Sequence, residues 1–141
     1  MKELEQSHRL LEIIPQLMRM IRTEMRKTAS DDMTVPQFRI LLKISKEPHS
    51  NRELADWMGV SAPTMSKLVD RLVERKLIER SETSSDRRQI SLVATPEGKK
   101  RAMHARGLVQ QVFEKKISQL STQKKRDLSN GLTALQELIS P

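Results

Sequence analysis

The side chains predicted to face outward from a helix over residues 61–75 are small and polar near its start and basic further along. Small hydroxyl side chains can reach base edges in the major groove of DNA, and cations beyond them can hold the flanking phosphates. A helix that is only solvated more often carries long Glu and Lys side chains in its first turns. The candidate DNA-contacting residues of this helix are Ser61, Ala62, Pro63, Thr64, Ser66, Lys67 and Arg71.

A second charged group lies at the tip of a predicted β-hairpin. From residue 77 the hydrophobic period changes from helical to about two, which predicts strands near 78–82 and 89–94. The tip contains Asp86, Arg87 and Arg88. Arginines there can enter a minor groove narrowed by A·T-rich sequence, and Asp86 can orient a guanidinium by hydrogen bonding. The alternative is ordinary loop charge.

Residues 51–75 have the pattern of a helix-turn-helix. Ala55 supplies the small residue needed where the two helices cross, and Gly59 tolerates a positive φ in the turn. An ordinary helical hairpin would have a similar core, but the polar and basic outer face of the second helix favours the helix-turn-helix. The apolar residues predicted to lock the two helices are Leu54, Met58, Val60, Met65 and Leu68.

Capping signals and apolar spacing predict the remaining helices. Residues 4–28 form an amphipathic pattern in which Pro15 predicts a bend or a late start. Thr34 with Gln37, and Ser50 with Glu53, fit capping boxes that open two further helices. Ser61 caps the second helix of the motif. A long helix is expected from Thr95-Pro96-Glu97 to Leu120, and a last one after Ser121 and Thr122.

The flanking helices are expected to pair two copies of the chain. Each is apolar along one stripe, which could also complete a monomeric core. Pairing across a two-fold axis would bury the stripes and present two recognition helices to half-sites of a pseudo-palindrome. We therefore expect a DNA-binding domain over 34–95 (helix-turn-helix 51–75, wing 77–95) and dimerisation helices over 1–33 and 96–141. The candidate dimerisation residues are Leu10, Ile14, Leu17, Ile21, Val112, Phe113, Ile117, Leu120, Leu128, Leu132 and Leu135.

Composition narrows the function classes. The 141 residues carry a net charge of +8 and a pI near 10.1, which favours polyanionic partners. Residues 61–106 hold eleven basic against six acidic side chains. The absence of cysteine excludes disulfides, thiolate metal sites and thiol catalysis. With no apolar run long enough for a membrane span and no signal peptide, a cytoplasmic protein without membrane contact is expected.

Catalysis and metal binding are not predicted. No set of nucleophile, base and orienting group is visible, and there is no glycine-rich phosphate loop. His8, His49 and His104 are scattered without metal-ligand spacing, so neither a metal nor another cofactor is expected. Two other readings stay open: a sequence-neutral architectural DNA-binding protein, and a winged helix that contacts only proteins.

The chain resembles the MarR family of winged helix-turn-helix transcription regulators over essentially its whole length. The most specific part runs from Leu77-Ile-Glu-Arg through Ser85-Asp-Arg-Arg to Thr95-Pro-Glu-Gly98. The resemblance implies a mainly α fold with a small β-hairpin wing (α+β) and a helical dimerisation domain. It implies a homodimeric, ligand-responsive transcriptional repressor that binds double-stranded DNA. In such a complex Arg88 would lie in the minor groove and the helix that begins after Ser61 would lie in the major groove.

One residue departs from the family pattern, and one implied site is weakly marked. Family members often have Gly where this chain has Lys76, so a left-handed backbone there would cost about 1 kcal/mol. The resemblance also implies an effector pocket between the dimer helices and the DNA-binding domain. Methionines can line such a pocket, although packing in the ordinary core is the alternative for them. Arginines of the first helix can hold an anion, although a solvated helical face is the alternative for them. The candidates are Met18, Met20, Met25, Met103, Arg19, Arg22 and Arg26.

Overall fold

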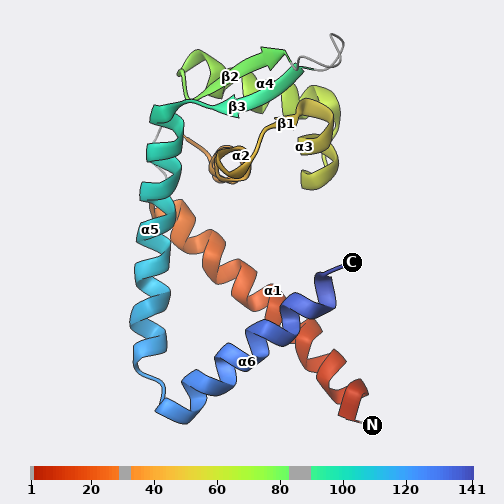
Figure 1. The fold of residues 1–141 in the computed structure, drawn as a ribbon, viewed down its shortest axis with the longest axis vertical. Helices are drawn as coiled ribbons and strands as arrows, with labels where there is room; N and C mark the ends of the chain where they lie inside the picture. The colour runs from red at the N-terminus through yellow and green to blue at the C-terminus, as the bar shows by residue number, and fades with distance from the viewer. Residues whose placement is uncertain (1, 29–32, 83–89) are drawn as a thin grey trace. The chain divides into compact units, whose positions relative to one another are not determined.

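A computed structural model describes residues 2–28, 33–82 and 90–141 of the chain (Figure 1). Helices dominate, with three short strands, so the predicted mainly α fold with a β wing is confirmed. The elements in chain order are α1 (Lys2–Thr28), α2 (Val35–Lys46), β1 (His49–Ser50), α3 (Asn51–Met58), α4 (Ala62–Glu74), β2 (Ile78–Glu82), β3 (Ile90–Ala94), α5 (Pro96–Ser118) and α6 (Thr122–Ile139).

Side-chain caps set where the helices begin. Thr34 accepts from the backbone N–H of Gln37 while the Gln37 side chain accepts from the backbone N–H of Thr34, so the predicted capping box of α2 is confirmed. Ser50 and Ser61 cap α3 and α4, and Ser121 caps α6. Each cap satisfies a backbone donor that has no partner inside its helix.

Helix α1 begins at Lys2 and continues through Pro15 to Thr28. The expected late start near Pro15 is therefore wrong. The proline leaves the carbonyl of Leu11 without its helical partner. Both residues are exposed, so water can satisfy that carbonyl and the helix need not end.

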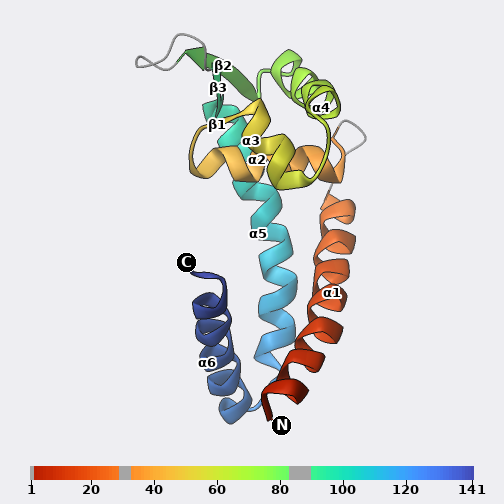
Figure 2. The same ribbon diagram turned by 90° about the vertical axis from the view of Figure 1, so that its right-hand side faces the viewer.

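Residues Met1–Val109 form one compact unit with a continuous apolar core. Figure 2 shows α2, α3, α4 and the strands gathered around the first turns of α5. Met25 of α1 and Ala102 and Ala105 of α5 also belong to this core. The largest side chains that are almost fully buried are Ile40, Leu41, Leu54, Met65, Val69, Leu72, Leu77 and Ile78.

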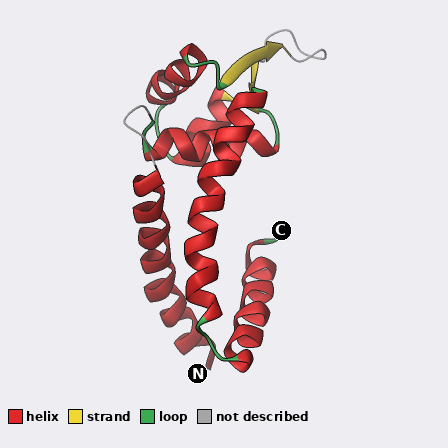
Figure 3. Cartoon of the chain, turned by 90° about the vertical axis from the view of Figure 1, so that its left-hand side faces the viewer, coloured by secondary structure: helices red, strands yellow, loops and turns green. Residues whose placement is uncertain are grey.

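The strands, drawn in yellow in Figure 3, form one antiparallel sheet. Their order in the sheet is β1-β3-β2. In the hairpin, Ile78 pairs with Ala94 and Glu82 with Ile90, close to the predicted strand limits. Strand β1 was not expected. It pairs His49 with Leu92, which attaches the chain just before α3 to the wing.

Residues Gln110–Pro141 form the second compact unit, which contains the end of α5 and all of α6. No residue of α6 is buried. Among the described residues, none of the helices has both the length and the apolar character that a membrane crossing requires.

Candidate nucleic-acid interface

Helices α3 and α4 form the helix-turn-helix that the sequence predicts. Ala55 is buried where the two helices pack, and Gly59 ends α3 in the left-handed conformation with φ 74° and ψ 33°. The N–H groups of Gly59 and Val60 both donate to the Ala55 carbonyl, at 2.9 and 3.0 Å. The Asn51 side chain donates to the carbonyl of Ala62 at 3.3 Å, which ties the start of α3 to the start of α4.

The outer face of α4 and its cap carries the predicted DNA-contacting residues. Met65, Val69 and Leu72 are buried on the inner face. Of the predicted residues, only Ser66 is half-buried. The exposed ones are Ser61, Ala62, Pro63, Thr64, Lys67 and Arg71.

The hydroxyls of Ser61 and Thr64 have different roles. The Ser61 hydroxyl accepts from the Thr64 backbone N–H at 3.2 Å and donates its proton to Thr64 Oγ1 at 2.9 Å. That proton is therefore used inside the protein. The hydroxyl proton of Thr64 remains a donor at the exposed start of α4, and a base acceptor is a suitable partner for it.

The base of the wing contains the residue that departs from the family pattern. Lys76 has φ 60°, so the left-handed backbone considered for this position is present. Thr95 Oγ1 donates to the Lys76 carbonyl at 2.7 Å and accepts from the Gly98 N–H at 3.0 Å. A Cβ at Gly98 would lie 2.0 Å from the carbonyl oxygen of Leu77. Thr95 and Gly98 of the quoted motif therefore hold α5 against the turn that precedes β2.

The predicted minor-groove residues Asp86, Arg87 and Arg88 lie outside the described residues. The strands that lead to them are described, and they lie at the same end of the first unit as α4 in both views (Figures 1 and 2).

An ion pair that the sequence does not predict joins α4 to the wing. Arg80 Nη2 of β2 donates to Asp70 Oδ1 of α4 at 2.5 Å. Both side chains are about half exposed. An acidic residue between the cations Lys67 and Arg71 was the available signal, but its partner follows only from the folded arrangement.

A second polar cluster lies at the start of α3. His49 Nδ1 is 3.0 Å from Glu53 Oε2, and His49 Nε2 is 3.5 Å from Glu47 Oε1. The hydrogen bond from His49 lowers the pKa of the Glu53 carboxyl below its ordinary value. The backbone N–H of Glu53 donates to the capping hydroxyl of Ser50, so cap and imidazole fix the same helical turn.

The predicted dimerisation residues are incompletely covered within one chain. None of the eleven side chains is buried: six are partly exposed and five are exposed. The exposed ones are Ile14, Leu17, Ile117, Leu120 and Leu132. Further large apolar side chains of α1, Leu4, Leu11 and Ile13, are also exposed.

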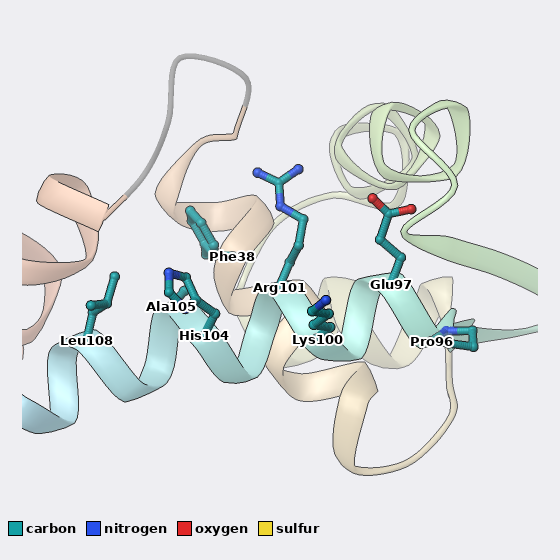
Figure 4. Close-up of a pocket in the computed structure, with 8 residues that line it drawn as sticks. All are labelled: Phe38, Pro96, Glu97, Lys100, Arg101, His104, Ala105 and Leu108. Carbon is teal, nitrogen blue, oxygen red and sulfur yellow. The ribbon is translucent and has the colours of Figure 1, made fainter.

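A pocket of about 830 Å³ lies in the first unit between α2 and the first half of α5 (Figure 4). Phe38 and Ala105 supply buried apolar surface, and Lys100, Arg101 and His104 supply groups that can carry positive charge. Its lining includes none of the methionines or α1 arginines considered from the sequence. The complete lining is Phe38, Pro96, Glu97, Lys100, Arg101, His104, Ala105 and Leu108.

Comparisons with known proteins agree with this arrangement. Residues 31–89 match the model of the MarR family. An uncharacterized HTH-type transcriptional regulator of Bacillus subtilis (strain 168), YfiV, is 27% identical over 107 residues. The match covers 74% of this chain and 66% of that protein, so the chain spans slightly less than two thirds of this relative's length.

Solved structures share the fold over nearly the whole chain. The transcriptional regulator Tm0710 from Thermotoga maritima is 28% identical, with a TM-score of 0.74 and coverage of 94% of both chains. RV1404 from Mycobacterium tuberculosis has a TM-score of 0.78 at 24% identity, covering 98% of this chain and 94% of its own. The match to the MarR family model covers the segment that contains α2, the helix-turn-helix and β2 of the wing, so the chain is similar to the transcription regulators of that family.

Proposed function

We propose that the protein binds double-stranded DNA sequence-specifically as a homodimer and represses transcription from a pseudo-palindromic operator. One observation carries the proposal: the start of α4 exposes Thr64, followed by Lys67 and Arg71 at successive turns. A hydroxyl donor suits a contact with base edges, and cations at the following turns suit contacts with phosphates, which supports the proposal. The β-hairpin next to α4 supports a second contact with DNA, made by the wing.

The incompletely covered apolar residues support a dimer. Large apolar side chains of α1, α5 and α6 remain exposed in one chain, and α6 buries no residue. Exposed apolar side chains that follow one face of a helix are typical of interaction sites. A second copy with the same stripes is a self-complementary partner, because a two-fold axis brings identical surfaces together. The domain limits 34–95 for DNA binding, and 1–33 and 96–141 for dimerisation, remain part of this proposal.

Selection of bound duplexes from a random DNA pool tests the specificity. We expect an enriched pseudo-palindrome with half-sites about one helical turn apart. A broad, unenriched pool would favour an architectural protein. Negligible binding at physiological salt would favour a winged helix that contacts only proteins. Light scattering at micromolar concentration tests the assembly, and a well-behaved monomer would contradict the dimer.

The salt dependence of binding tests whether residues 61–88 form the DNA surface. If about three basic side chains per subunit contact phosphate, a dimer releases about six counterions. The slope of log K against log salt is then near −5. A slope shallower than about −2 would place the DNA surface elsewhere. Deleting residues 122–141 should weaken operator binding, because the proposed dimer loses α6.

The pocket between α2 and α5 supports an effector role for small organic anions. Its apolar floor is formed by Phe38 and Ala105, and the ammonium group of Lys100 and the imidazole of His104 also line it. Operator affinity can be measured with a series of carboxylates of increasing apolar size, from acetate to naphthoate. We expect release by the larger members and a reduced response in Lys100→Gln. Lys99→Gln is the matched control, since Lys99 is exposed on the same helix and does not line the pocket.

A further inference from the structure

Asp70 stands among the candidate phosphate-binding cations of α4. Lys67 lies three residues before it and Arg71 one residue after it, and all three side chains are exposed. A free carboxylate at this place would repel a DNA backbone. The Arg80 guanidinium from β2 is bonded to it at 2.5 Å, so the negative charge is matched by a residue of another element.

The bond leaves most of the guanidinium available. Arginine has five N–H donors in a fixed planar fork, and the contact with Asp70 joins one of its terminal nitrogens to one carboxylate oxygen. The Arg80 side chain is 45% exposed, so its other donors can reach a partner outside the protein. An arginine held by a carboxylate presents those donors with less loss of side-chain freedom than an unrestrained one.

We propose that Arg80 is a phosphate-binding residue for the DNA backbone and that Asp70 is its positioning residue. Arg80, on β2 of the wing, would thus add a third phosphate-binding cation to Lys67 and Arg71 of the recognition helix. The Asp70–Arg80 pair also joins α4 to β2, so that the recognition helix and the wing keep a fixed distance from each other. This inference rests on the proposed DNA binding.

The sign of the effect at Asp70 separates positioning from bulk charge. Asp70→Asn removes one negative charge per protomer, and a model based on charge alone predicts tighter DNA binding. If Asp70 positions Arg80, the same substitution weakens binding, by about two- to five-fold per half-site for an exposed pair. Glu74→Gln is the matched control. Glu74 is exposed one turn further along α4, and no ion pair is found for it among the described residues.

The experiment measures binding of the selected operator duplex by fluorescence anisotropy over a range of salt concentrations. Arg80→Gln should lower the magnitude of the salt slope by about 1.8 for a dimer that loses two phosphate contacts. Asp70→Asn should weaken binding in the wild-type background and have no weakening effect in the Arg80→Gln background, because Asp70 acts through Arg80. Asp70→Glu keeps the carboxylate and should retain most of the affinity. Far-UV circular dichroism confirms that each variant is folded.

The possible outcomes are distinct. Tighter binding by both Asp70→Asn and Glu74→Gln would overturn the positioning role. An unchanged salt slope in Arg80→Gln would overturn the phosphate contact. Equal weakening by Asp70→Asn with and without Arg80 would show that Asp70 acts through another group and would also overturn the proposal. A wild-type protein that selects no duplex would instead overturn the proposed function.

Discussion

The hydroxyl of Thr95 joins the first turn of α5 to a carbonyl 19 residues earlier, at Lys76. It donates to that carbonyl at 2.7 Å and accepts from the backbone N–H of Gly98 at 3.0 Å. The backbone N–H of Thr95 also donates to Leu77 at 3.0 Å. One buried residue thus caps a long helix and holds the turn that begins the wing.

Gly98→Ala should destabilise the protein strongly. The added Cβ would lie 2.0 Å from the Leu77 carbonyl oxygen, and backbone atoms cannot move aside as a flexible side chain can. We expect a loss of about 3 kcal/mol or more in the free energy of unfolding, measured by urea denaturation. Gly107→Ala is the matched control in the same helix. Its Cβ would meet no atom within 4 Å, and it should stabilise the protein by about 0.5–1 kcal/mol.

Lys76→Gly should stabilise the protein. Lys76 has φ 60°, which costs a residue with a Cβ about 1–2 kcal/mol, and glycine removes that cost while adding freedom to the unfolded chain. The expected net gain is about 0.5–1 kcal/mol in urea unfolding. Glu74→Gly, two residues earlier inside α4, should lose about 1 kcal/mol. A destabilised Lys76→Gly would mean that the lysine side chain makes a compensating contact.

Local features of the fold were predictable from the sequence. The caps at Thr34, Ser50 and Ser61 depend on neighbours within three residues, so residue type and spacing were sufficient. The turn at Gly59 was predictable for the same reason. Strand β1 was not, because two residues carry no periodicity and its existence depends on pairing with β3.

The site was predictable only in part. The exposed face of α4 followed from helical spacing, which also identified Met65 as inward. The Asp70–Arg80 pair depends on how α4 packs against β2, which no local pattern encodes. The pocket lining depends likewise on the packing of α2 against α5.

Thr64→Val should relax sequence preference at one position in each half-site. The substitution keeps the shape of the side chain and removes the hydroxyl proton left free by the Ser61 contact. A lost base contact should cost about 1–3 kcal/mol on the preferred operator and less on variants at that position. Competition binding with single-base operator variants measures this. Thr64→Ser keeps the hydroxyl and should retain the preference; equal loss on all sequences would indicate a backbone contact.

Arg88→Ala should weaken binding most on operators with A·T-rich flanks. A guanidinium in the minor groove senses its width, and A·T-rich sequence narrows the groove and strengthens its negative potential. Asp86→Ala should reproduce part of the loss even though it removes a negative charge, because the carboxylate is expected to orient the arginine. Titrations with A·T-flanked and G·C-flanked duplexes decide the matter. Tighter binding of Asp86→Ala to both would leave Asp86 without an orienting role.

The stability that Glu53 contributes should disappear in acid. Its pKa is lowered in the folded protein by the hydrogen bond from His49, so it stabilises the fold above the ordinary carboxyl pKa of 4.5. That contribution is lost as pH falls through the lower, folded-state value. Glu53→Gln should therefore have a lower urea midpoint than the wild type at pH 6, with the difference shrinking below pH 4.5. A difference that stays constant with pH would assign the effect to packing.

The stacking of Arg39 and Lys43 of α2 on Trp57 of α3 gives the molecule an internal optical reporter. The guanidinium carbon and the ammonium nitrogen lie 5.1 and 5.3 Å from the ring centroid. Trp57 is the single tryptophan and the chain has no tyrosine, so the intrinsic fluorescence of the unlabelled protein comes from one indole. The emission energy of an indole responds to the electric field of nearby cations. A shift of its emission maximum on adding DNA or a carboxylate would therefore report a change in the electric field at the contact between α2 and α3, without any attached dye.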